Sequence, residues 1–439
     1  MKVAILGFNL EGVASYDYYS TKGHEITICD RSTEVEVPEG TDSQLGDNYL
    51  DNLDRFDILV RSPGLYPQDI LDKNPDVADK ITTQTNEFLE VCPTKNIIGV
   101  TGTKGKGTTS SLITAMLKAD GKTVHLGGNI GVPVFDLLKA GIDVNDWVVL
   151  EMSNFQLIDL KKPPHIGVCL MVVPEHLDWH PDSEDYFKSK FNLFAHQSED
   201  DIAVFYKQNE TSTRIASNGS GKKIPYFENP GAFVENNVIK IDGQDICRTD
   251  ELKLLGKHNW QNACAAVTVA WQVTQNVEAL HQALSTFETM EHRLEFVREL
   301  DGVKYYNDSF GTTPETAMVA VEAFEEPLVL ITGGSEKGAD YNELVSTIFD
   351  NNVKHVICMG ITGLKIAELL ETRKVEKLVS YTTWDSYDNL TMPVIVAKAR
   401  EQANSGDIVL LSTGSASFDM FKNYKDRGEK FKQAVQELA

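Results

Sequence analysis

Two hydrophobic patterns alternate along this chain of 439 residues. Short apolar runs typical of buried strands, such as residues 2–8 and 97–100, are followed by stretches whose apolar residues recur at helical spacing. Strands that alternate with helices in this way form mainly parallel sheets covered by helices. The pattern therefore predicts an α/β fold, which we divide into domains at residues 1–92, 93–289 and 290–439.

The most distinctive pattern lies within residues 96–118. The apolar strand 97–100 runs into a glycine-rich loop, and helical periodicity begins at Thr108. A strand, such a loop and a helix form a phosphate cradle, because the loop N–H groups and the positive end of the helix dipole face the anion. The residues expected to bind phosphate are Gly102, Thr103, Lys104, Gly105, Lys106, Gly107, Thr108 and Thr109.

Within this loop, Lys106 is placed to reach the outer phosphates, and the hydroxyl of Thr108 or Thr109 is placed to hold Mg²⁺. Gly107 separates Lys106 from Thr108, so the strict Walker sequence is not met. The same residues are also compatible with a flexible loop between a strand and a helix that binds nothing.

A second glycine-containing turn lies near the start of the chain. Gly7 and Gly12 enclose a short polar segment between a strand and a helix, and the next strand ends at Asp30. Asn9 stands where a dinucleotide-binding turn has its middle glycine, which disfavours NAD because the pyrophosphate needs that close approach. A smaller nucleotide and a purely structural turn are both compatible with these residues.

Polar residues follow two apolar strands of the central region. Glu151 ends the strand predicted at 146–150, and His176 follows the strand predicted at 166–173. Carboxyl ends of strands in α/β sheets face the ligand crevice. If these strands are neighbours, Glu151 and His176 lie near the Lys106 loop and can bind Mg²⁺ or Mn²⁺. Each of them alone is more often a capping or surface residue.

Three further segments complete the central region. Residues 186–194 are predicted to form one helix, and residues 236–237 and 242–243 are hairpin turn signals. Asn259 and Asn262 lie three apart at the start of a helix. That spacing can read an adenine edge, although on the residues alone we prefer simple helix-start positions.

The last third of the chain again alternates strands with helices and predicts a second doubly wound unit. Polar segments follow its strands at residues 307–309, 333–340 and 412–417. Arg293 and Lys337, judged by themselves, are ordinary solvated charges.

Composition narrows the possible partners. The formal net charge of −24 disfavours a general nucleic-acid surface. Six scattered cysteines without a CxxC pair indicate reduced thiols in a reducing compartment. The first residues read as a strand and not as a signal peptide, and no apolar run is long enough to span a membrane. We therefore expect a cytoplasmic protein that binds neither nucleic acid nor membrane.

Motifs along essentially the whole chain resemble those of the Mur ligases, ATP-dependent amide-forming enzymes of peptidoglycan synthesis and hence of cell shape and division. Each motif is weak alone, whereas nine in register are specific. They read GTKGKGTT, GGNIG, EMSNFQL, PEHLDWH, GKHNWQNACAA, EHRLE, NDS, GGSEKGAD and SASFDMFKNYKDRG. The resemblance implies an N-terminal Rossmann-like domain for a UDP-sugar, a central P-loop ATPase domain with a mainly parallel sheet, and a C-terminal Rossmann-like domain for an amino acid. Within the family, the chain looks like the members that add D-glutamate to UDP-N-acetylmuramoyl-L-alanine.

The resemblance also implies a reaction. The γ-phosphoryl of ATP passes to a carboxylate, and an amine then attacks the acyl phosphate. The catalytic residues that it implies are Lys106, His176, Lys190 and Arg293. Two Mg²⁺ ions are implied, with the ligands Thr108, Glu151, His176 and Lys190, the last as a carbamate.

Binding residues follow from the same resemblance. Outside the loop, those implied for ATP are Asn259, Asn262, Arg293 and Asp308. Those implied for the UDP-sugar are Leu10, Glu11, Asp30, Arg31, Gly64, Asn129 and Ser153. Those implied for D-glutamate are Thr312, Lys337, Ser417 and Phe418. We expect the protein to be a monomer.

Some positions depart from the family pattern. Gly107 replaces the usual Ser or Thr, as in folate polyglutamate synthases, and Phe310 stands where a lysine is usual. Folate polyglutamylation is thus a competing activity, and the complete βαβ domain before the loop argues against it. A related ligase with a different amino acid and a catalytically dead nucleotide-sugar binder are also compatible with the motifs. A dead relative would have lost part of the catalytic set.

Overall fold

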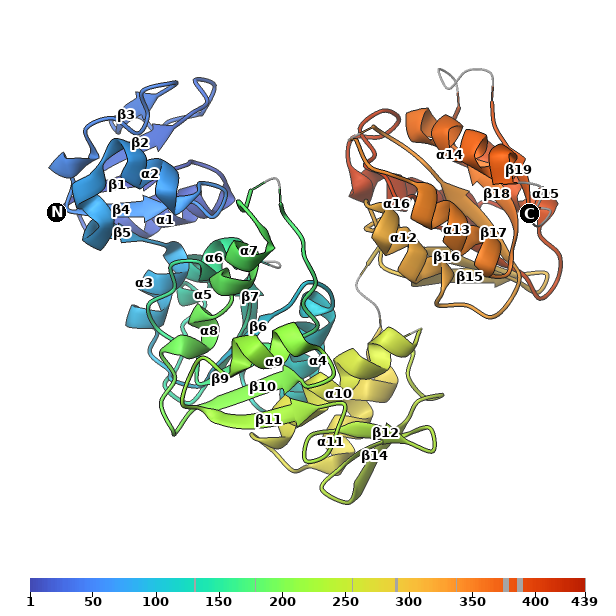
Figure 1. Cartoon of the computed structure of the whole chain (residues 1–439), viewed down its shortest axis with the longest axis horizontal. Helices are drawn as coiled ribbons and strands as arrows, with labels where there is room; N and C mark the ends of the chain where they lie inside the picture. The colour runs from blue at the N-terminus through green and yellow to red at the C-terminus, as the bar shows by residue number, and fades with distance from the viewer. Residues whose placement is uncertain are drawn as a thin grey trace. The chain divides into compact units, whose positions relative to one another are not determined.

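A computed structural model describes residues 1–129, 132–177, 179–254, 256–288, 291–336, 338–373, 379–384 and 390–438 (Figure 1). The chain forms two compact units. The first comprises Met1–Leu252 and His258–Phe287, and the second comprises Lys253–Lys257 and Glu288–Ala439.

The N-terminal sheet of the first unit is parallel, with strand order β3-β2-β1-β4-β5. Its strands are β1 Lys2–Leu6, β2 Glu25–Asp30, β3 Asp42–Leu45, β4 Ile58–Arg61 and β5 Ile81–Thr82. Its helices are α1 Leu10–Ser20, α2 Pro67–Lys73 and α3 Gln84–Val91, with the 3₁₀ turns η1 Leu53–Arg55 and η2 Pro75–Lys80. From β1, the chain first adds β2 and β3 on one side of the sheet and then adds β4 and β5 on the other side. In such folds, ligand crevices open where the strand order reverses, here between β1 and β4.

The turn between β1 and α1 is built around Asn9. Its side-chain oxygen accepts hydrogen bonds from the N–H groups of Glu11 and Gly12 at 3.2 and 3.3 Å, and its amide donates to the Ser62 hydroxyl at 2.9 Å. A Cβ on Gly12 would lie 2.3 Å from the Gly7 carbonyl oxygen, so only glycine fits there. Asn9 thus caps α1 and ties it to the end of β4, at the position where a dinucleotide site has a glycine.

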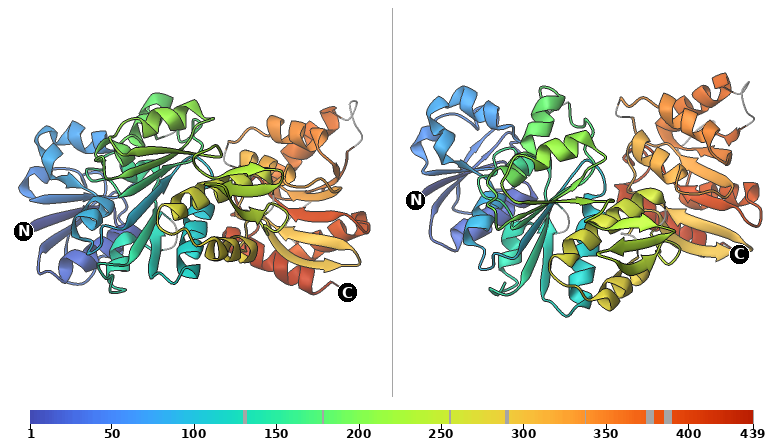
Figure 2. Two further views of the ribbon diagram at one scale, coloured as in Figure 1. Left: turned by 90° about the horizontal axis from the view of Figure 1, so that it is seen from below. Right: turned by 60° about the horizontal axis from the view of Figure 1, so that its bottom comes forward.

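The central sheet of the first unit is also parallel, with order β11-β10-β9-β6-β8-β7. Its strands are β6 Ile97–Thr101, β7 Val124–Gly128, β8 Trp147–Glu151, β9 Ile166–Cys169, β10 Ile202–Tyr206 and β11 Lys222–Tyr226. Its helices are α4 Lys106–Ala119, α5 Val134–Leu138, α6 Asn154–Leu157, α7 Ser183–Ser189, α8 Asn192–Ala195 and α9 Glu210–Ala216. Helices cover both faces of this sheet, with α4 on one face and α7 and α9 on the other (Figure 2).

A small antiparallel sheet, β12-β13-β14, completes the first unit together with two helices. These elements are β12 Phe233–Glu235, β13 Val238–Ile241, β14 Gln244–Arg248, α10 Lys257–Trp271 and α11 Val277–Thr286. The predicted turns at 236–237 and 242–243 are confirmed, and all four residues have positive φ. The flanking strands β12 and β14 were not predicted. Helix α11 packs on both β14 and α4.

The second unit contains one sheet of order β15-β16-β20-β17-β18-β19, in which β15 alone is antiparallel to its neighbour. Its strands are β15 Glu295–Leu300, β16 Val303–Asn307, β17 Leu328–Thr332, β18 Val353–Cys358, β19 Ser380–Thr382 and β20 Ile408–Leu411. Its helices are α12 Pro314–Val321, α13 Asn342–Asp350, α14 Gly360–Arg373, α15 Met392–Gln402 and α16 Tyr424–Gln436. Two hydrophobic cores form, one beneath α12, α13 and α14 and one beneath α15 and α16. The prediction of an α/β fold with mainly parallel sheets is confirmed.

Strand β9 is shorter than the predicted strand at 166–173. It ends at Cys169 because the following residues turn to the glycine-rich loop: the Thr103 N–H donates to the Met171 carbonyl, and the Thr103 hydroxyl donates to the Val173 carbonyl, each at 2.9 Å. The predicted end of this strand therefore lines the loop instead of extending the sheet.

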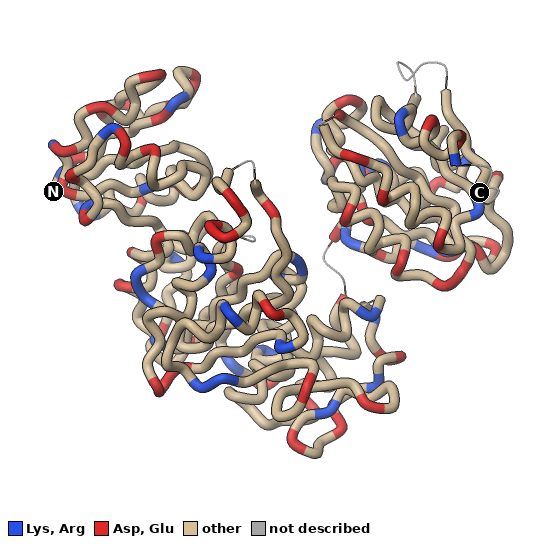
Figure 3. Tube along the Cα trace, viewed as in Figure 1, with Lys and Arg blue, Asp and Glu red and all other residues tan. Residues whose placement is uncertain are grey.

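Charge and thiols agree with the composition. Acidic residues occur throughout the described trace, with basic residues among them (Figure 3). All six cysteines are free thiols. Within the described residues, every helix is too short or too polar to cross a membrane.

Arg61, at the end of β4, is fully buried and joins the two larger sheets of the first unit. Its Nε and Nη2 donate to the two carboxylate oxygens of Asp159 at 2.9 and 3.0 Å, and Nη2 also donates to the Phe155 carbonyl at 2.8 Å. Its Nη1 donates to the carbonyl oxygens of Ser62, Pro63 and Leu65 at 2.7–3.2 Å. This full set of partners offsets the cost of burying the charge.

Arg61→Met should lower the free energy of unfolding of the first unit by about 2–4 kcal/mol, because Asp159 and several carbonyls lose their partner. Urea denaturation followed by tryptophan fluorescence measures this loss. The exposed Arg55, which donates to the Gln44 side chain, is the matched control. Arg55→Met should change stability by less than about 0.5 kcal/mol. Equal losses of stability for the two variants would contradict the role given to Arg61 in joining the two larger sheets.

Candidate active site

The loop between β6 and α4 has the form of a phosphate cradle. Gly102 and Gly105 have φ values of +153° and +86°, and α4 begins at Lys106, earlier than the periodicity predicted. A Cβ on Gly105 would lie 2.2 Å from Asn262 Oδ1, and one on Gly102 would lie 2.7 Å from Leu170 Cβ. Because Gly105 has no side chain to cap α4, the amides of the first turn are left for an anion.

Lys106 lies over this loop. Its Nζ donates to the carbonyl oxygens of Gly102 and Thr103, each at 3.0 Å. On α4, the hydroxyls of Thr109 and Ser110 are buried and have no hydrogen-bond partner among the described residues. A buried hydroxyl without a partner costs about 1–3 kcal/mol, which is a cost that ligand sites often carry.

Strand order brings other polar residues to the loop. Strand β6 lies between β8 and β9, so Glu151 at the end of β8 and residues 170–176 after β9 flank the loop on its two sides. We expected Glu151 and His176 near the loop if β8 and β9 were neighbouring strands, but these two strands are not neighbours. Both strands instead adjoin β6, and their carboxyl ends meet at the same edge of the sheet.

Glu151 is a nearly buried carboxylate at this edge. Its Oε1 accepts a hydrogen bond from Asn129 Nδ2 at 2.7 Å, and its backbone carbonyl accepts one from the Asn129 N–H at 2.9 Å. Its Oε2 accepts no hydrogen bond from the residues that the structure describes. A fixed carboxylate with one such oxygen suits a divalent cation.

His176 has a φ of +57°, which is uncommon for a residue with a side chain. Its Nε2 lies 3.6 Å from Glu175 Oε2, and its ring centroid lies 4.8 Å from that of Phe155. Glu175 also forms an ion pair with Lys104 of the loop at 2.9 Å. The imidazole is therefore held next to the loop, as the sequence predicted.

A hydrogen-bonded network beside His176 was missed by the sequence reasoning. His180 is buried, with Nε2 2.8 Å from Asn154 Nδ2 and Nδ1 2.6 Å from Asp185 Oδ2. Asp185 also accepts the Tyr66 hydroxyl at 3.1 Å. The carboxylate favours the tautomer with the proton on Nδ1. In the sequence, the second histidine four residues after His176 was the signal that could have indicated this network.

Lys190 lies at a break in the helix predicted for 186–194. Hydrogen bonds between residues three apart tighten the chain there, so α7 ends before Lys190 and α8 begins after it. The Lys190 side chain is almost fully buried, with Nζ 3.5 Å from Thr101 Oγ1 and 4.6 Å from the Tyr186 ring centroid. Burial, together with the positive charge of Lys106, lowers the pKa of Lys190 to about 7.

The two asparagines of α10 are buried next to the loop. Asn262 Nδ2 donates to Asn259 Oδ1 at 2.9 Å, and Asn262 Oδ1 occupies the space that a Cβ on Gly105 would need. A simple helix-start role does not require this contact with the phosphate cradle. Their place favours the nucleotide-binding interpretation.

Ser153 is connected to α1 of the N-terminal sheet. Its N–H donates to Gln156 Oε1 at 3.0 Å, and Gln156 Nε2 donates to Glu11 Oε1 at 2.8 Å. Burial raises the pKa of Glu11 above its usual range, against the hydrogen bond from Gln156. Two residues predicted for the UDP-sugar thus lie at the ends of one hydrogen-bonded chain, through a residue that was not predicted.

At the carboxyl edge of the N-terminal sheet lie four more residues predicted for the UDP-sugar, namely Leu10, Asp30, Arg31 and Gly64. The remaining one, Asn129, follows β7 of the central sheet and contacts Glu151. Asp30 Oδ2 accepts the Phe8 N–H at 2.6 Å, and the Gly64 carbonyl accepts Trp179 Nε1–H at 2.9 Å. The exposed residues of the set predicted for the UDP-sugar are Leu10, Arg31, Gly64 and Asn129.

In the second unit, Asp308 follows β16 and is buried. Its Oδ2 accepts the Ser412 hydroxyl at 2.7 Å, and its Oδ1 accepts the Leu294 N–H at 3.2 Å. Burial raises the pKa of Asp308 to about 7, against the Ser412 hydrogen bond and the charge of Arg293. The Arg293 guanidinium carbon lies 5.7 Å from the Phe310 ring centroid. The positive charge of Arg293 thus acts on Asp308, and the binding of ATP by either residue stays a prediction.

The turns after β17 and β20 of the second unit pack together. A Cβ on Gly334 would lie 2.2 Å from the Ala416 carbonyl oxygen, and Ser335 pairs with Ala416 in an isolated antiparallel bridge. The fully buried Arg427 of α16 holds this region: it donates to the Ser415 carbonyl at 3.0 Å and to the Ser309 carbonyl and hydroxyl at 2.8 Å.

The residues predicted for D-glutamate belong to these turns. Ser417 is buried next to the Arg427 contacts, Thr312 is partly exposed, and Phe418 is 67% exposed. Lys337, predicted as the cation of this pocket, lies outside the described residues.

Comparisons with known proteins agree with this geometry. Residues 100–270 match the Mur ligase middle domain, and residues 292–415 match the Mur ligase, glutamate ligase domain. A Clostridium tetani protein named UDP-N-acetylmuramoylalanine--D-glutamate ligase is 35% identical over 456 residues, which cover 100% of this chain and 97% of that protein. A Clostridium acetobutylicum protein of the same name is 35% identical over 463 residues, covering 100% and 96%.

Solved structures share the fold at lower identity. A MurF ligase from Thermotoga maritima in complex with ADP gives a TM-score of 0.61 at 17% identity, covering 100% of this chain and 95% of that one. A MurF from Acinetobacter baumannii gives 0.63 at 14%, covering 99% and 93%. Together with the domain matches and the full-length relatives, these findings show that the chain belongs to the Mur ligase family.

Proposed function

We propose that this chain is an ATP-dependent ligase that joins D-glutamate to the alanine carboxylate of UDP-N-acetylmuramoyl-L-alanine. One observation carries this proposal. The glycine-rich loop with Lys106, the carboxylate of Glu151 and the buried amine of Lys190 converge at the ends of three adjacent strands, in a chain similar over its whole length to ligases of that name. Its free thiols suit the reducing cytoplasm, where we propose that the reaction takes place. We also propose that the protein is a monomer.

The proposed reaction has two steps. A carboxylate oxygen of the sugar nucleotide attacks the γ-phosphorus of ATP, and the bond to the β–γ bridging oxygen breaks to release ADP. The D-glutamate amine then attacks the acyl carbon, phosphate leaves, and the amine loses a proton. Because the first step joins two anions, positive charge in fixed positions lowers its barrier. We assign Lys106 to the β and γ phosphates and Arg293 to the γ phosphate.

The ligands proposed for two Mg²⁺ ions fit the donor chemistry of the site. Glu151 offers its Oε2, and Thr108 offers a hydroxyl on the first turn of α4. His176 and a carbamate on Lys190 complete the set. Mg²⁺, when bound, supplies positive charge against the phosphates.

The surroundings of Lys190 support the proposed carbamate. A buried ammonium close to Lys106 is costly, and this cost favours the neutral amine. The neutral amine can take up CO₂ with loss of one proton, which turns a potential cation into an anionic ligand. That anion also removes the repulsion with Lys106.

We divide the chain by substrate into a UDP-sugar domain at 1–92, an ATP domain at 93–289 and an amino-acid domain at 290–439. For the UDP-sugar we propose Leu10, Glu11, Asp30, Arg31, Gly64, Asn129 and Ser153. For the adenine and ribose of ATP we propose Asn259, Asn262 and Asp308. For D-glutamate we propose Thr312, Lys337, Ser417 and Phe418.

Phosphate release tests the proposal directly. The protein is incubated with ATP, Mg²⁺ and UDP-N-acetylmuramoyl-L-alanine, and a panel of amino acids is added in turn. D-glutamate should give sustained phosphate release and a product heavier by one glutamyl group, whereas L-glutamate, L-lysine and diaminopimelate should not. Turnover with another amino acid would identify a different ligase, and sugar-nucleotide binding without any phosphate release would identify a non-catalytic binder.

Lys106→Ala should reduce ATP-dependent turnover at least about 100-fold, because a positive charge at the transferring phosphoryl group is lost. The dissociation constant for the UDP-sugar, measured by calorimetry, should stay within about twofold. Lys118, exposed near the end of the same helix, is the matched control, and Lys118→Ala should keep full activity. A fully active Lys106→Ala enzyme would refute the role given to the loop.

Lys190 should take up ¹³CO₂ from labelled bicarbonate, giving a carbamate signal in the ¹³C NMR spectrum. With a pKa of about 7, the neutral amine is scarce at pH 6 and prevails at pH 8, so the signal should grow as the pH rises through 7. Lys190→Ala should lack the signal and be nearly inactive, with partial rescue by short carboxylic acids.

The exposed Lys188 provides the control for Lys190. Lys188→Ala should retain both the carbamate signal and the activity. A carbamate signal that persists in Lys190→Ala would show that another amine carries it.

A further inference from the structure

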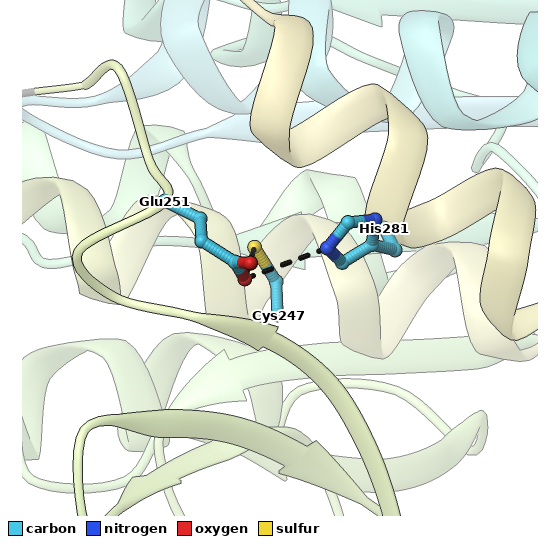
Figure 4. A group of neighbouring side chains, drawn as sticks. All are labelled: Cys247, Glu251 and His281. Atoms are coloured by element: carbon cyan, nitrogen blue, oxygen red, sulfur yellow. Dashed lines mark hydrogen bonds and ion pairs between the residues drawn. The ribbon is translucent and has the colours of Figure 1, made fainter.

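A group of metal-binding side chains lies where β14, the turn after it and α11 meet (Figure 4). Cys247 belongs to β14, Glu251 to the turn and His281 to α11. Their sulfur, carboxylate-oxygen and ring-nitrogen atoms all lie within 4.8 Å of one another. None of the three residues has a part in the proposed ligase reaction.

The distances within this group match those of ligands around one tetrahedral zinc ion. Cys247 Sγ lies 3.7 Å from Glu251 Oε2, and His281 Nε2 lies 3.4 Å from the same oxygen. Zinc bonds of about 2.3 Å to sulfur and about 2.0–2.1 Å to nitrogen and oxygen give tetrahedral edges of about 3.6 Å for sulfur–oxygen and about 3.4 Å for nitrogen–oxygen. Two of the three edges of the group are therefore already at the spacing of zinc ligands, and the third, between Cys247 Sγ and His281 Nε2, is at most 4.8 Å.

The site is also held in place and open to solvent. The Arg248 N–H donates to Glu251 Oε2 at 2.9 Å, which fixes the carboxylate. Cys247 is buried within the small sheet, and the buried Leu280 and Leu284 anchor α11. The Glu251 and His281 side chains are 42% and 44% exposed, so an ion has a path from the solvent.

A second group of possible ligands differs in one respect. Glu291, His292 and Glu429 also lie close together. The Lys432 ammonium, however, lies 2.6 Å from Glu291 and 2.9 Å from Glu429, so a side chain of the protein already neutralises these two carboxylates. Glu251 instead interacts with the Arg248 N–H, the Cys247 thiol and the His281 ring, and no described lysine or arginine side chain forms an ion pair with it.

We propose that Cys247, Glu251 and His281 bind one zinc ion, with the fourth position taken by water. A thiolate with an imidazole selects zinc over the Mg²⁺ used in the ligase reaction. Binding releases the thiol proton of Cys247 to solvent. The ion would fasten the antiparallel sheet to α11, which in turn packs on α4, the helix that follows the phosphate loop.

Cobalt titration of the chelator-treated full-length protein tests the proposal. In excess Mg²⁺, which keeps the ligase site filled, one Co²⁺ per chain should bind with a thiolate-to-cobalt charge-transfer band and the intense visible bands of tetrahedral Co²⁺. Zinc should displace this cobalt stoichiometrically and raise the melting temperature of the protein.

Ligand variants locate the ion. Cys247→Ser should abolish the charge-transfer band, and His281→Gln should weaken zinc binding at least about 100-fold, as loss of a direct ligand exceeds the effect of outer partners. If Cys247→Ser does not fold, Glu251→Gln is tested in its place. This variant keeps an oxygen that accepts the hydrogen bond from the Arg248 N–H but loses the carboxylate charge. Cys92→Ser changes a half-buried cysteine elsewhere in the same unit and is the matched control, with zinc binding unchanged.

Two results would overturn the proposal. Wild-type protein that binds no zinc and shows no charge-transfer band would reduce the group to an ion pair next to a thiol. A band that survives in Cys247→Ser, or is lost in Cys92→Ser, would place the ion at another cysteine.

Discussion

The pairing of β6 with β8 on one side and β9 on the other decides which polar residues meet at the carboxyl edge of the central sheet. Parallel strands deliver their carboxyl ends to one edge, so the glycine-rich loop, Glu151 and the segment leading to His176 meet there. The ion pair between Lys104 and Glu175 then ties the loop to this segment. The early end of β9 belongs to the same arrangement, because Thr103 takes the backbone groups that would have continued the strand. Lys190 is enclosed beneath this edge, where burial lowers the pKa of its amine.

Two buried arginines perform similar structural work at different sheets. Arg61 holds the loop after β4 and the segment around Asp159, and Arg427 holds the turns after β16 and β20. A guanidinium can satisfy many carbonyl groups from one position, which suits irregular turns that lack regular hydrogen-bonding partners. The penalty for burying the charge is tolerable only while every donor is matched, so these turns are firm but sensitive to substitution.

Much of this fold can be predicted from sequence, and the reasons are local. Strand β20 and the two hairpin turns follow from apolar runs and from turn residues that accept positive φ. The break at Lys190 cannot be predicted in this way, because the helical pattern continues through it and burial against other segments decides the outcome. The Asn154–His180–Asp185 network and the link from Ser153 through Gln156 to Glu11 join residues whose closeness depends on the folded topology.

The contact between Gly105 and Asn262 has a consequence for how this protein can diverge. The amide oxygen of Asn262 fills the space next to Gly105, so the phosphate loop and the start of α10 share one steric boundary. A methyl group at Gly105 would meet this amide and would also have to adopt a φ of +86°, so a smaller residue at position 262 removes only one of the two obstacles. Position 105 is therefore restricted to glycine twice over, by the turn of its own backbone and by a side chain more than 150 residues away in the sequence.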